Sequence, residues 1–474
     1  MLFSSLIFLF GFLPLVILCY YISPGKLKNY TLLAFSILFY AWGGVTYTVI
    51  LLLSIILNYI FVKRIQTSET KSKTWLSIGL TVNVLVLVIF KYLGFFIENL
   101  NALFFLVADK ENSIPNVRIV LPLGISFFTF HQMSLLWDVY RNKATPAVKF
   151  TDTSLYITFF PQLVAGPIVR YKDIIGQIRG RTETWEFFNA GIQRFILGLF
   201  KKVIIANTCA SIADSVMAEQ LNTISSSAAW LGIVAYTLQI YFDFSGYSDM
   251  AIGLAKLFGF TIMENFNFPY ISKSIKEFWR RWHISLSTWF RDYVYIPLGG
   301  NQKSQRRTYL NLILVFFLTG FWHGATWSFI VWGLFHGIFL IIERLGLEKL
   351  LMKIPQVVSW AYTLLVVMIG WVFFRIEKLL DALEYILKLF GGGVTGSKSV
   401  LYFLDSEKLT ILILAIVSST ILVVKIKEVL DNIALNRFAG FYGLVKNIVL
   451  VFMFVYSVVI LNAGSYNPFI YFRF

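Results

Sequence analysis

Long apolar runs separated by short polar segments recur along the whole chain. A helix that crosses a bilayer core of about 30 Å needs about 20 predominantly apolar residues. We therefore predict helices at membrane depth near Leu2–Ile22, Tyr30–Trp42, Thr46–Val62, Trp75–Phe96, Ile119–Trp137, Leu155–Val169, Phe187–Ile205, Ala228–Asp243, Tyr309–Phe321, Ser328–Ile342, Val357–Phe374, Leu409–Val424 and Leu444–Leu461. Several of these runs are too short to cross alone, so we expect some to be re-entrant or broken. The pattern predicts an all-α, polytopic membrane protein with about 10–13 transmembrane or re-entrant helices.

The composition favours one membrane domain over several soluble ones. Of 474 residues, 58% are hydrophobic and 14% are charged, whereas about 25% of the residues in soluble domains are charged. No soluble domain interrupts the pattern, whose longest polar connections are Glu98–Arg118, Arg170–Glu186 and Gly391–Glu407. The first apolar run follows no basic segment and has no small-residue cleavage site, so we expect a retained helix with an outward N-terminus.

The formal net charge of +16, from 41 Lys and Arg against 25 Asp and Glu, would suggest nucleic acid in a soluble protein. Here the basic residues cluster in short loops, as the positive-inside rule requires of cytoplasmic loops. The clusters are Lys26 with Lys28, Lys63 and Arg64 with Lys71 and Lys73, Arg141 with Lys143, Arg179 with Arg181, and Lys303 with Arg306 and Arg307. We therefore expect membrane lipids around the chain and no nucleic-acid partner. The two cysteines, Cys19 and Cys209, form no zinc-binding spacing.

The segment Trp279–Gly300, with the sequence WRRWHISLSTWFRDYVYIPLGG, combines tryptophans with arginines. A single helix over Lys276–Tyr293 would place four polar residues within about 80° of one another: Arg280, His283, Ser287 and Arg291. Pro297 and Gly299 would then end this helix. Guanidinium groups match phosphate oxygens, so the polar face is suited to a phosphate-bearing ligand. The alternative is an interfacial amphipathic helix without any chemistry.

The chain has four histidines, which are His131, His283, His323 and His336. Ionisable groups at membrane depth are costly, so each one is a functional candidate. His323 lies in TGFWHGATW between two glycines that allow backbone or ligand to approach closely. A neutral imidazole there can act as a general base, although a structural histidine fits the same residues equally well. His336 follows after 13 residues, about 220° round a helix, and we expect structural roles for His336 and His131.

Two carboxylates, Asp243 and Asp249, interrupt the apolar segment YFDFSGYSDMAIGLAKLFGF. No further Asp, Glu or His cluster supplies the remaining ligands of a metal, so we expect no metal site. We interpret these residues as polar contacts between helices.

The string WRRWHISLSTWFRDYVYIPLGG closely resembles the signature of bacterial membrane-bound O-acyltransferases, and TGFWHGATW resembles the apolar context of their catalytic histidine. The strings NFNFPY, FFPQLVAGPIVRY and NPFIYFRF also look like family strings, and the resemblance is strongest from about Leu121 to Glu343. The resemblance implies one domain over residues 1–474, with helices around a central funnel. We expect N-terminal helices at 1–118, a catalytic core at 119–345 and C-terminal helices at 346–474.

The same resemblance implies roles for individual residues. His323 would be the catalytic base and His283 would support it by orienting substrate or tuning the site. The alternative for His283 is a role as an internal hydrogen-bond anchor only. From the polar face of the Trp279–Gly300 segment and the context of His323, we expect Arg280, Ser287, Arg291 and Trp322 to bind substrate. The family branch that this chain looks most like O-acetylates alginate, other exopolysaccharides or peptidoglycan.

We therefore expect transfer of acetyl from cytoplasmic acetyl-CoA across the bacterial cytoplasmic (inner) membrane to a glycan, without a bound cofactor. The basic loops at Arg179 and Arg181 and at Lys303, Arg306 and Arg307 would hold the phosphates of acetyl-CoA. Because the chain has no extracytoplasmic catalytic domain, we expect a periplasmic or membrane-anchored partner of the SGNH acetyltransferase type. One alternative is D-alanyl transfer to teichoic acid. Another is a lipid-linked sugar transporter, which would need internal repeats with broken helices, and no repeat is apparent.

Overall fold

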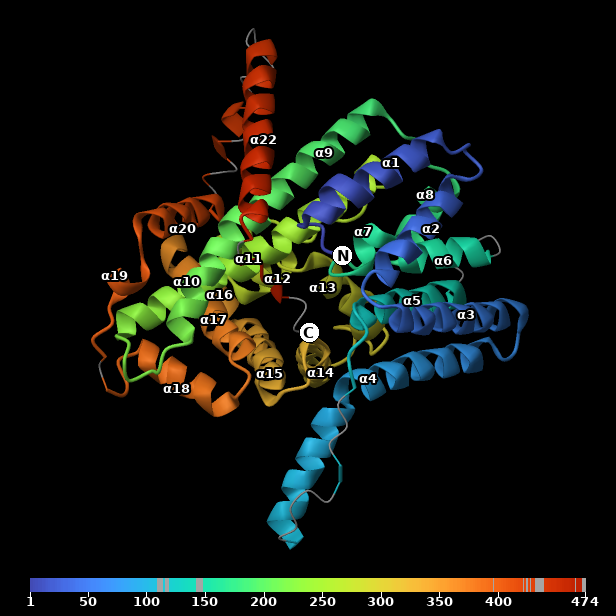
Figure 1. Cartoon of the computed structure of the whole chain (residues 1–474). Coiled ribbons are helices and arrows are strands. Elements are labelled where there is room, and N and C mark those ends of the chain that lie inside the picture. Colours follow the sequence, from blue (N-terminus) through green and yellow to red (C-terminus); the bar gives the residue numbers. More distant parts are fainter. Residues whose placement is uncertain are drawn as a thin grey trace.

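The computed structural model describes the chain except for residues 109–113, 116–118, 142–147, 395, 421, 423–424, 427, 431–438, 465 and 471–474. Within the described residues the regular structure is helical, apart from one isolated bridge between Ile224 and Lys398. The predicted all-α fold is confirmed. Figure 1 shows the helices gathered around one body, from which α22 (Ala439–Asn462) and the end of α4 (Ser72–Ala108) project in opposite directions.

The helices follow one another in three groups along the chain. The first group contains η1 (Phe8–Phe12), α1 (Leu13–Ile22), α2 (Lys28–Ala41), α3 (Val45–Thr67) and α4. The second contains α5 (Ile125–Tyr140), α6 (Phe150–Thr158), α7 (Phe160–Leu163), α8 (Tyr171–Arg179), α9 (Trp185–Phe200), η2 (Lys201–Ala206), α10 (Asn207–Met217), α11 (Ser226–Leu257), η3 (Pro269–Ile271), α12 (Ile275–Arg281), α13 (Ile284–Phe290), η4 (Arg291–Tyr295), α14 (Gln305–His323) and α15 (Trp327–Ile342). The third contains η5 (Glu343–Leu347), α16 (Glu348–Leu351), α17 (Gln356–Arg375), α18 (Leu379–Leu389), α19 (Val400–Phe403), α20 (Ser406–Ser418) and α22.

Six helical segments of the described residues are long and apolar enough to cross a membrane: Val45–Thr67, Ser72–Val107, Trp185–Met217, Trp327–Leu351, Gln356–Arg375 and Gly440–Asn462. The chain is therefore a multi-pass membrane protein. The predicted total of 10–13 also counted re-entrant and broken segments, and Leu155–Val169 does fold as short helices. The predicted run Leu409–Val424 begins as α20, and its end lies outside the described residues. Lys143 and the last four residues of NPFIYFRF also lie outside them.

Helix α11 forms the centre of the bundle, and almost all of its residues are buried. It packs against α9, and glycines allow the two backbones to approach closely. A Cβ atom at Gly198 would stand 2.5 Å from the carbonyl oxygen of Gly246, and one at Gly253 would stand 2.7 Å from that of Gly191. Small residues at such crossings are typical of membrane helix pairs, which gain packing contacts where the backbones meet.

The carboxylates of α11 connect it to its neighbours. Asp243 pairs with Lys202 of η2 at 2.7 Å, and both side chains are at most 3% exposed. Asp249 pairs with Arg194 of α9 at 2.6 Å and with Lys201 of η2 at 2.7 Å. The interpretation of this segment as polar contacts between helices is confirmed.

Candidate active site

His323 is the last residue of α14 and lies buried inside the bundle. Its ring lies among three aromatic rings, with centroid separations of 4.8 Å to Trp322, 5.0 Å to Trp332 and 5.1 Å to Phe374. Two of these rings come from other helices, α15 and α17. The imidazole is therefore held in a largely apolar environment with little access for bulk water.

A close crossing of α14 and α15 places His323 against Trp332. A Cβ atom at Gly320 would stand 2.3 Å from the carbonyl oxygen of Phe329, and one at Gly333 would stand 2.2 Å from that of Phe316. These positions therefore require glycine, because no side chain fits between the two backbones. The close approach that the sequence predicted at Gly320 is confirmed.

The predicted single helix over Lys276–Tyr293 is wrong. Helix α12 ends before His283, which adopts a left-handed conformation with φ 44° and ψ 53°, and α13 begins at Ile284. The loop before α12 provides the reason. The backbone N–H of Ile284 donates to the carbonyl oxygen of Asn265 at 3.0 Å, and the N–H of Ser285 donates to Asn265 Oδ1 at 3.2 Å. These bonds satisfy N–H groups at the start of α13 that would otherwise lack partners.

The break directs His283 into the core. Its Nδ1 lies 3.1 Å from Asn265 Oδ1, and its ring lies 4.7 Å from that of Phe244. Its ring centroid is 6.2 Å from that of Trp322, which also contacts His323. Residues that are 40 positions apart in the sequence thus share one aromatic site.

Arg280 and Ser287 line a cavity of about 240 Å³ that is bounded by α12, α13, α14 and α15. Lys276 adds a second cationic group to its wall, while Thr319 lies on α14 one turn before His323. The cavity therefore combines cationic groups on α12 with an otherwise mainly apolar lining.

Arg291 lies away from this cavity because the broken helix turns it elsewhere. It is 59% exposed and pairs with Asp292 at 2.8 Å. Arg170 also hydrogen-bonds Asp292, and Lys172 lies 3.5 Å from it. Partial burial raises the pKa of Asp292, but the hydrogen bond from Arg291 and the charges of the three cations outweigh it and lower the pKa below 3.8. The four residues of the predicted polar face thus lie in three places. Arg280 and Ser287 line the cavity, His283 lies in the core, and Arg291 lies at the surface beside Asp292.

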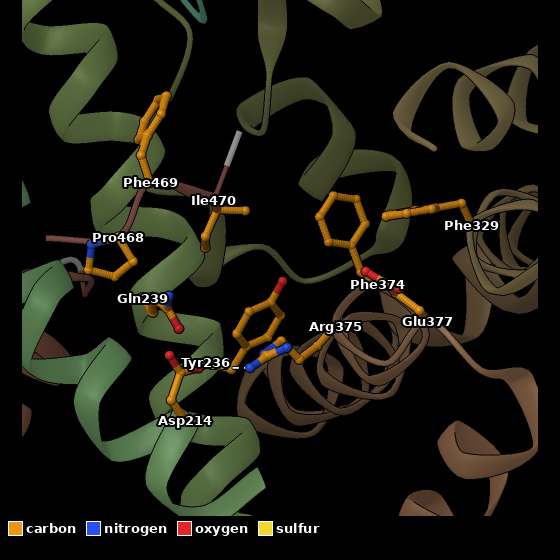
Figure 2. Close-up of a pocket in the computed structure, with 10 residues that line it drawn as sticks. All are labelled: Asp214, Tyr236, Gln239, Phe329, Phe374, Arg375, Glu377, Pro468, Phe469 and Ile470. Atoms are coloured by element: carbon orange, nitrogen blue, oxygen red, sulfur yellow. Dashed lines mark hydrogen bonds and ion pairs between the residues drawn. The ribbon is translucent and has the colours of Figure 1, made fainter. Parts of the chain in front are cut away.

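A second cavity, of about 40 Å³, is lined by Phe374, whose ring contacts His323. Figure 2 shows Phe374 and Phe329 on one side of it and the C-terminal segment Pro468–Ile470 on the other. Arg375 and Asp214, which pair at 2.8 Å, also line it. Since Phe374 contacts His323, a single ring separates the imidazole from this cavity.

The two basic loops expected to hold phosphates differ in their contacts. Arg181 is only 7% exposed and donates hydrogen bonds to the Tyr20 hydroxyl and the Phe258 carbonyl. Arg179 pairs with Asp152 at 3.0 Å. The side chains at Lys303, Arg306 and Arg307, in contrast, are exposed.

Sequence reasoning overlooked Lys91, which reaches from α4 to the end of α14. Its Nζ donates to the carbonyl oxygens of Trp322 at 2.6 Å and His323 at 3.2 Å. The sequence did contain a signal for this residue, because a lysine in the apolar run Trp75–Phe96 is costly unless it has partners. His336 lies in the same aromatic layer, 5.4 Å from the ring of Trp332.

Comparison with known proteins shows the family of the chain. Residues 142–376 match the membrane-bound O-acyltransferase family. A protein of Azotobacter vinelandii named "Probable alginate O-acetylase AlgI" is 40% identical over 503 residues, covering all of both chains. The chain belongs to the membrane-bound O-acyltransferase family. The family and this relative are both named for acyl transfer, which supports the acyltransferase prediction over the sugar-transporter alternative.

Other relatives of this O-acyltransferase carry different names. A peptidoglycan O-acetyltransferase of Helicobacter pylori is 37% identical over 428 residues, covering 82% of this chain and 80% of the relative. A teichoic acid D-alanyltransferase of Streptococcus thermophilus is 32% identical over 242 residues, covering 48% of this chain and 58% of the relative. The two O-acetylating relatives thus match much more of this chain.

Proposed function

We propose that this O-acyltransferase passes acetyl groups from cytoplasmic acetyl-CoA to a glycan outside the bacterial cytoplasmic membrane. The observation that carries the proposal is that aromatic contacts connect the buried His323 to two separate cavities. Trp279 lines the 240 Å³ cavity and contacts Trp332, whose ring lies against His323. Phe374 lines the other cavity and also contacts His323. We assign one cavity to the donor and the other to the acceptor, with His323 as the base that serves both.

The charges support an assignment of the donor side. Helices α14 and α15 form an antiparallel hairpin, so the end of α15 lies beside the start of α14, which follows Lys303. Glu343, just after α15, accepts the backbone N–H groups of Ile275 and Lys276 at the start of α12. Helix α12 and its cavity therefore begin at the basic end of the bundle, which the positive-inside rule assigns to the cytoplasm. Acetyl-CoA would enter there.

In the proposed reaction, the Nε2 or Nδ1 atom of neutral His323 takes the proton of an acceptor hydroxyl. The hydroxyl oxygen attacks the thioester carbonyl, a C–O bond forms, and the C–S bond breaks. The coenzyme A thiolate leaves and receives the proton from the imidazolium. The products are an acetyl ester and free coenzyme A. The enclosing aromatic rings reduce competition by water at the thioester.

The remaining predicted residues take supporting roles in this proposal. Arg280 and Ser287 would hold polar groups of the donor, with the guanidinium binding a phosphate. Trp322 would hold the imidazoles of His283 and His323 in place through its contacts with both. Arg291 lies outside the cavity, so we assign it no direct contact with the donor.

We propose a glycan of the alginate or cell-wall type as the final acceptor and an SGNH-type partner that receives or relays the acetyl group outside. The names of the two relatives that match most of this chain support O-acetylation. D-alanyl transfer to teichoic acid remains the second candidate, because a shorter match carries that name.

The test uses the purified full-length chain, acetyl-CoA labelled in the acetyl group and a glycan of the alginate or cell-wall type as the acceptor, with release of free coenzyme A as the readout. We expect His323→Ala to lower the rate at least about 100-fold, the lower end of what a general base contributes. His336→Gln is the matched control, since it changes another buried histidine of the same aromatic layer. Equal rates for wild type and His323→Ala would refute the role of His323.

A parallel assay separates the two candidate donors. A D-alanyl-loaded carrier protein replaces acetyl-CoA, and transfer of labelled D-alanine is measured. Activity with this donor and none with acetyl-CoA would show that the enzyme transfers D-alanine and not acetyl. The role of His323 would then be tested by measuring D-alanyl transfer in the His323→Ala variant.

A further inference from the structure

The end of α14 must be stabilised inside the protein, where water cannot satisfy it. The last four carbonyl groups of a helix have no partners within the helix. In α14 the first of these, at Gly320, accepts the N–H of Gly324 at 3.3 Å. The other three belong to Phe321, Trp322 and His323, and all three accept hydrogen bonds from α4.

Two neighbouring residues of α4 provide these bonds. The hydroxyl of Tyr92 donates to the carbonyl oxygen of Phe321 at 2.5 Å, and its ring stacks on the Phe321 ring with centroids 3.9 Å apart. Lys91 Nζ donates to the carbonyl oxygens of Trp322 at 2.6 Å and His323 at 3.2 Å. A cation at a helix C-terminus also interacts favourably with the helix dipole.

The third donor of Lys91 is used as well. A lysine ammonium has three N–H groups, and the third partner is the Oγ atom of Ser126 on α5, at 3.3 Å. The ammonium also lies 5.9 Å from the centroid of the Trp322 ring. With all three donors directed at protein acceptors, none is left for an oxyanion of the substrate. Its position therefore suits holding the helix end rather than stabilising a transition state.

We propose that Lys91 and Tyr92 form a clamp that sets the position of the His323 imidazole for acyl transfer. The inference rests on the proposed role of His323 as the base. His323 is the last residue of its helix, so loss of the bonds to its turn frees its backbone and lets the ring move. Misplacement by about 1 Å can lower a rate about 100-fold. Lys91 and Tyr92 are therefore positioning residues.

The test compares Lys91→Met, Lys91→Arg and Tyr92→Phe with Lys73→Met, an exposed lysine at the start of the same helix. Rates are measured on the purified full-length chain with labelled acetyl-CoA. We expect Lys91→Met to lower kcat about 100-fold with little change in KM. Lys91→Arg keeps the cation and its donors and should recover about a tenth of the wild-type kcat or more. Tyr92→Phe should lower kcat severalfold, and Lys73→Met should leave it unchanged.

Several outcomes would overturn the clamp. A folded Lys91→Met enzyme with wild-type kcat would do so, as would a rise in KM at constant kcat, which would indicate a donor-binding lysine. If Lys91→Met fails to fold, wild-type kcat in Tyr92→Phe contradicts the clamp. His323→Ala separates this inference from the proposed function. If His323→Ala stays active, the base assignment fails; if it is inactive while the Lys91 variants are normal, only the clamp fails.

Discussion

Replacing Gly320 by alanine tests whether the crossing of α14 and α15 places the catalytic histidine. The new Cβ atom would stand 2.3 Å from the carbonyl oxygen of Phe329, about 1 Å inside ordinary van der Waals contact. The clash is with backbone, so no side-chain rotation relieves it, and the two helices must separate. Overpacking of this kind costs about 1–3 kcal/mol of stability. His323, one turn further along α14, would move away from Trp332 by a comparable distance.

We expect Gly320→Ala to lower kcat for coenzyme A release about 100-fold, as a shift of about 1 Å in a catalytic group can do. The thermal midpoint of the purified protein in detergent should fall as well. Gly443→Ala is the control, because a Cβ atom there meets nothing within 4 Å. Wild-type kcat and an unchanged midpoint in Gly320→Ala would refute the claim that this crossing sets the site.

Three further predictions concern charged residues. Lys202→Met leaves the buried Asp243 carboxylate without its cation and should lower the free energy of unfolding by about 3–5 kcal/mol, measured by thermal or denaturant unfolding, with much of the loss recovered by adding Asp243→Leu. Arg280→Ala should raise the KM for acetyl-CoA about tenfold at nearly constant kcat in steady-state kinetics, whereas Arg291→Ala should change neither. The lowered pKa of Asp292 means that its carboxylate stabilises the fold above pH 3.8 and loses this effect as the pH falls through the lower folded pKa. Asp292→Asn should therefore lower the thermal midpoint at pH 7, and its difference from wild type should shrink below about pH 4.

Much of the architecture was readable from the chain alone. Apolar runs fix where helices form, because a backbone at membrane depth must satisfy its own hydrogen bonds. The glycine at Gly320 indicated close backbone approach, and the acids of α11 indicated contacts between helices. The string around His323 carried the family resemblance, which the comparisons confirmed. The roles of the individual site residues remain predictions.

The tertiary structure alone decided how the site is assembled. Regular periodicity predicted one helix through His283. In the structure the N–H groups of Ile284 and Ser285 donate hydrogen bonds to the oxygens of Asn265, which lies before α12, and the helix breaks at His283. This break separates Arg291 from Arg280. No local pattern contains such a bond, because its partner lies in a different segment of the chain. The same reason hid the role of Lys91. The sequence shows a costly lysine in an apolar run, and only the packing of α4 against the end of α14 shows which carbonyl groups stabilise it.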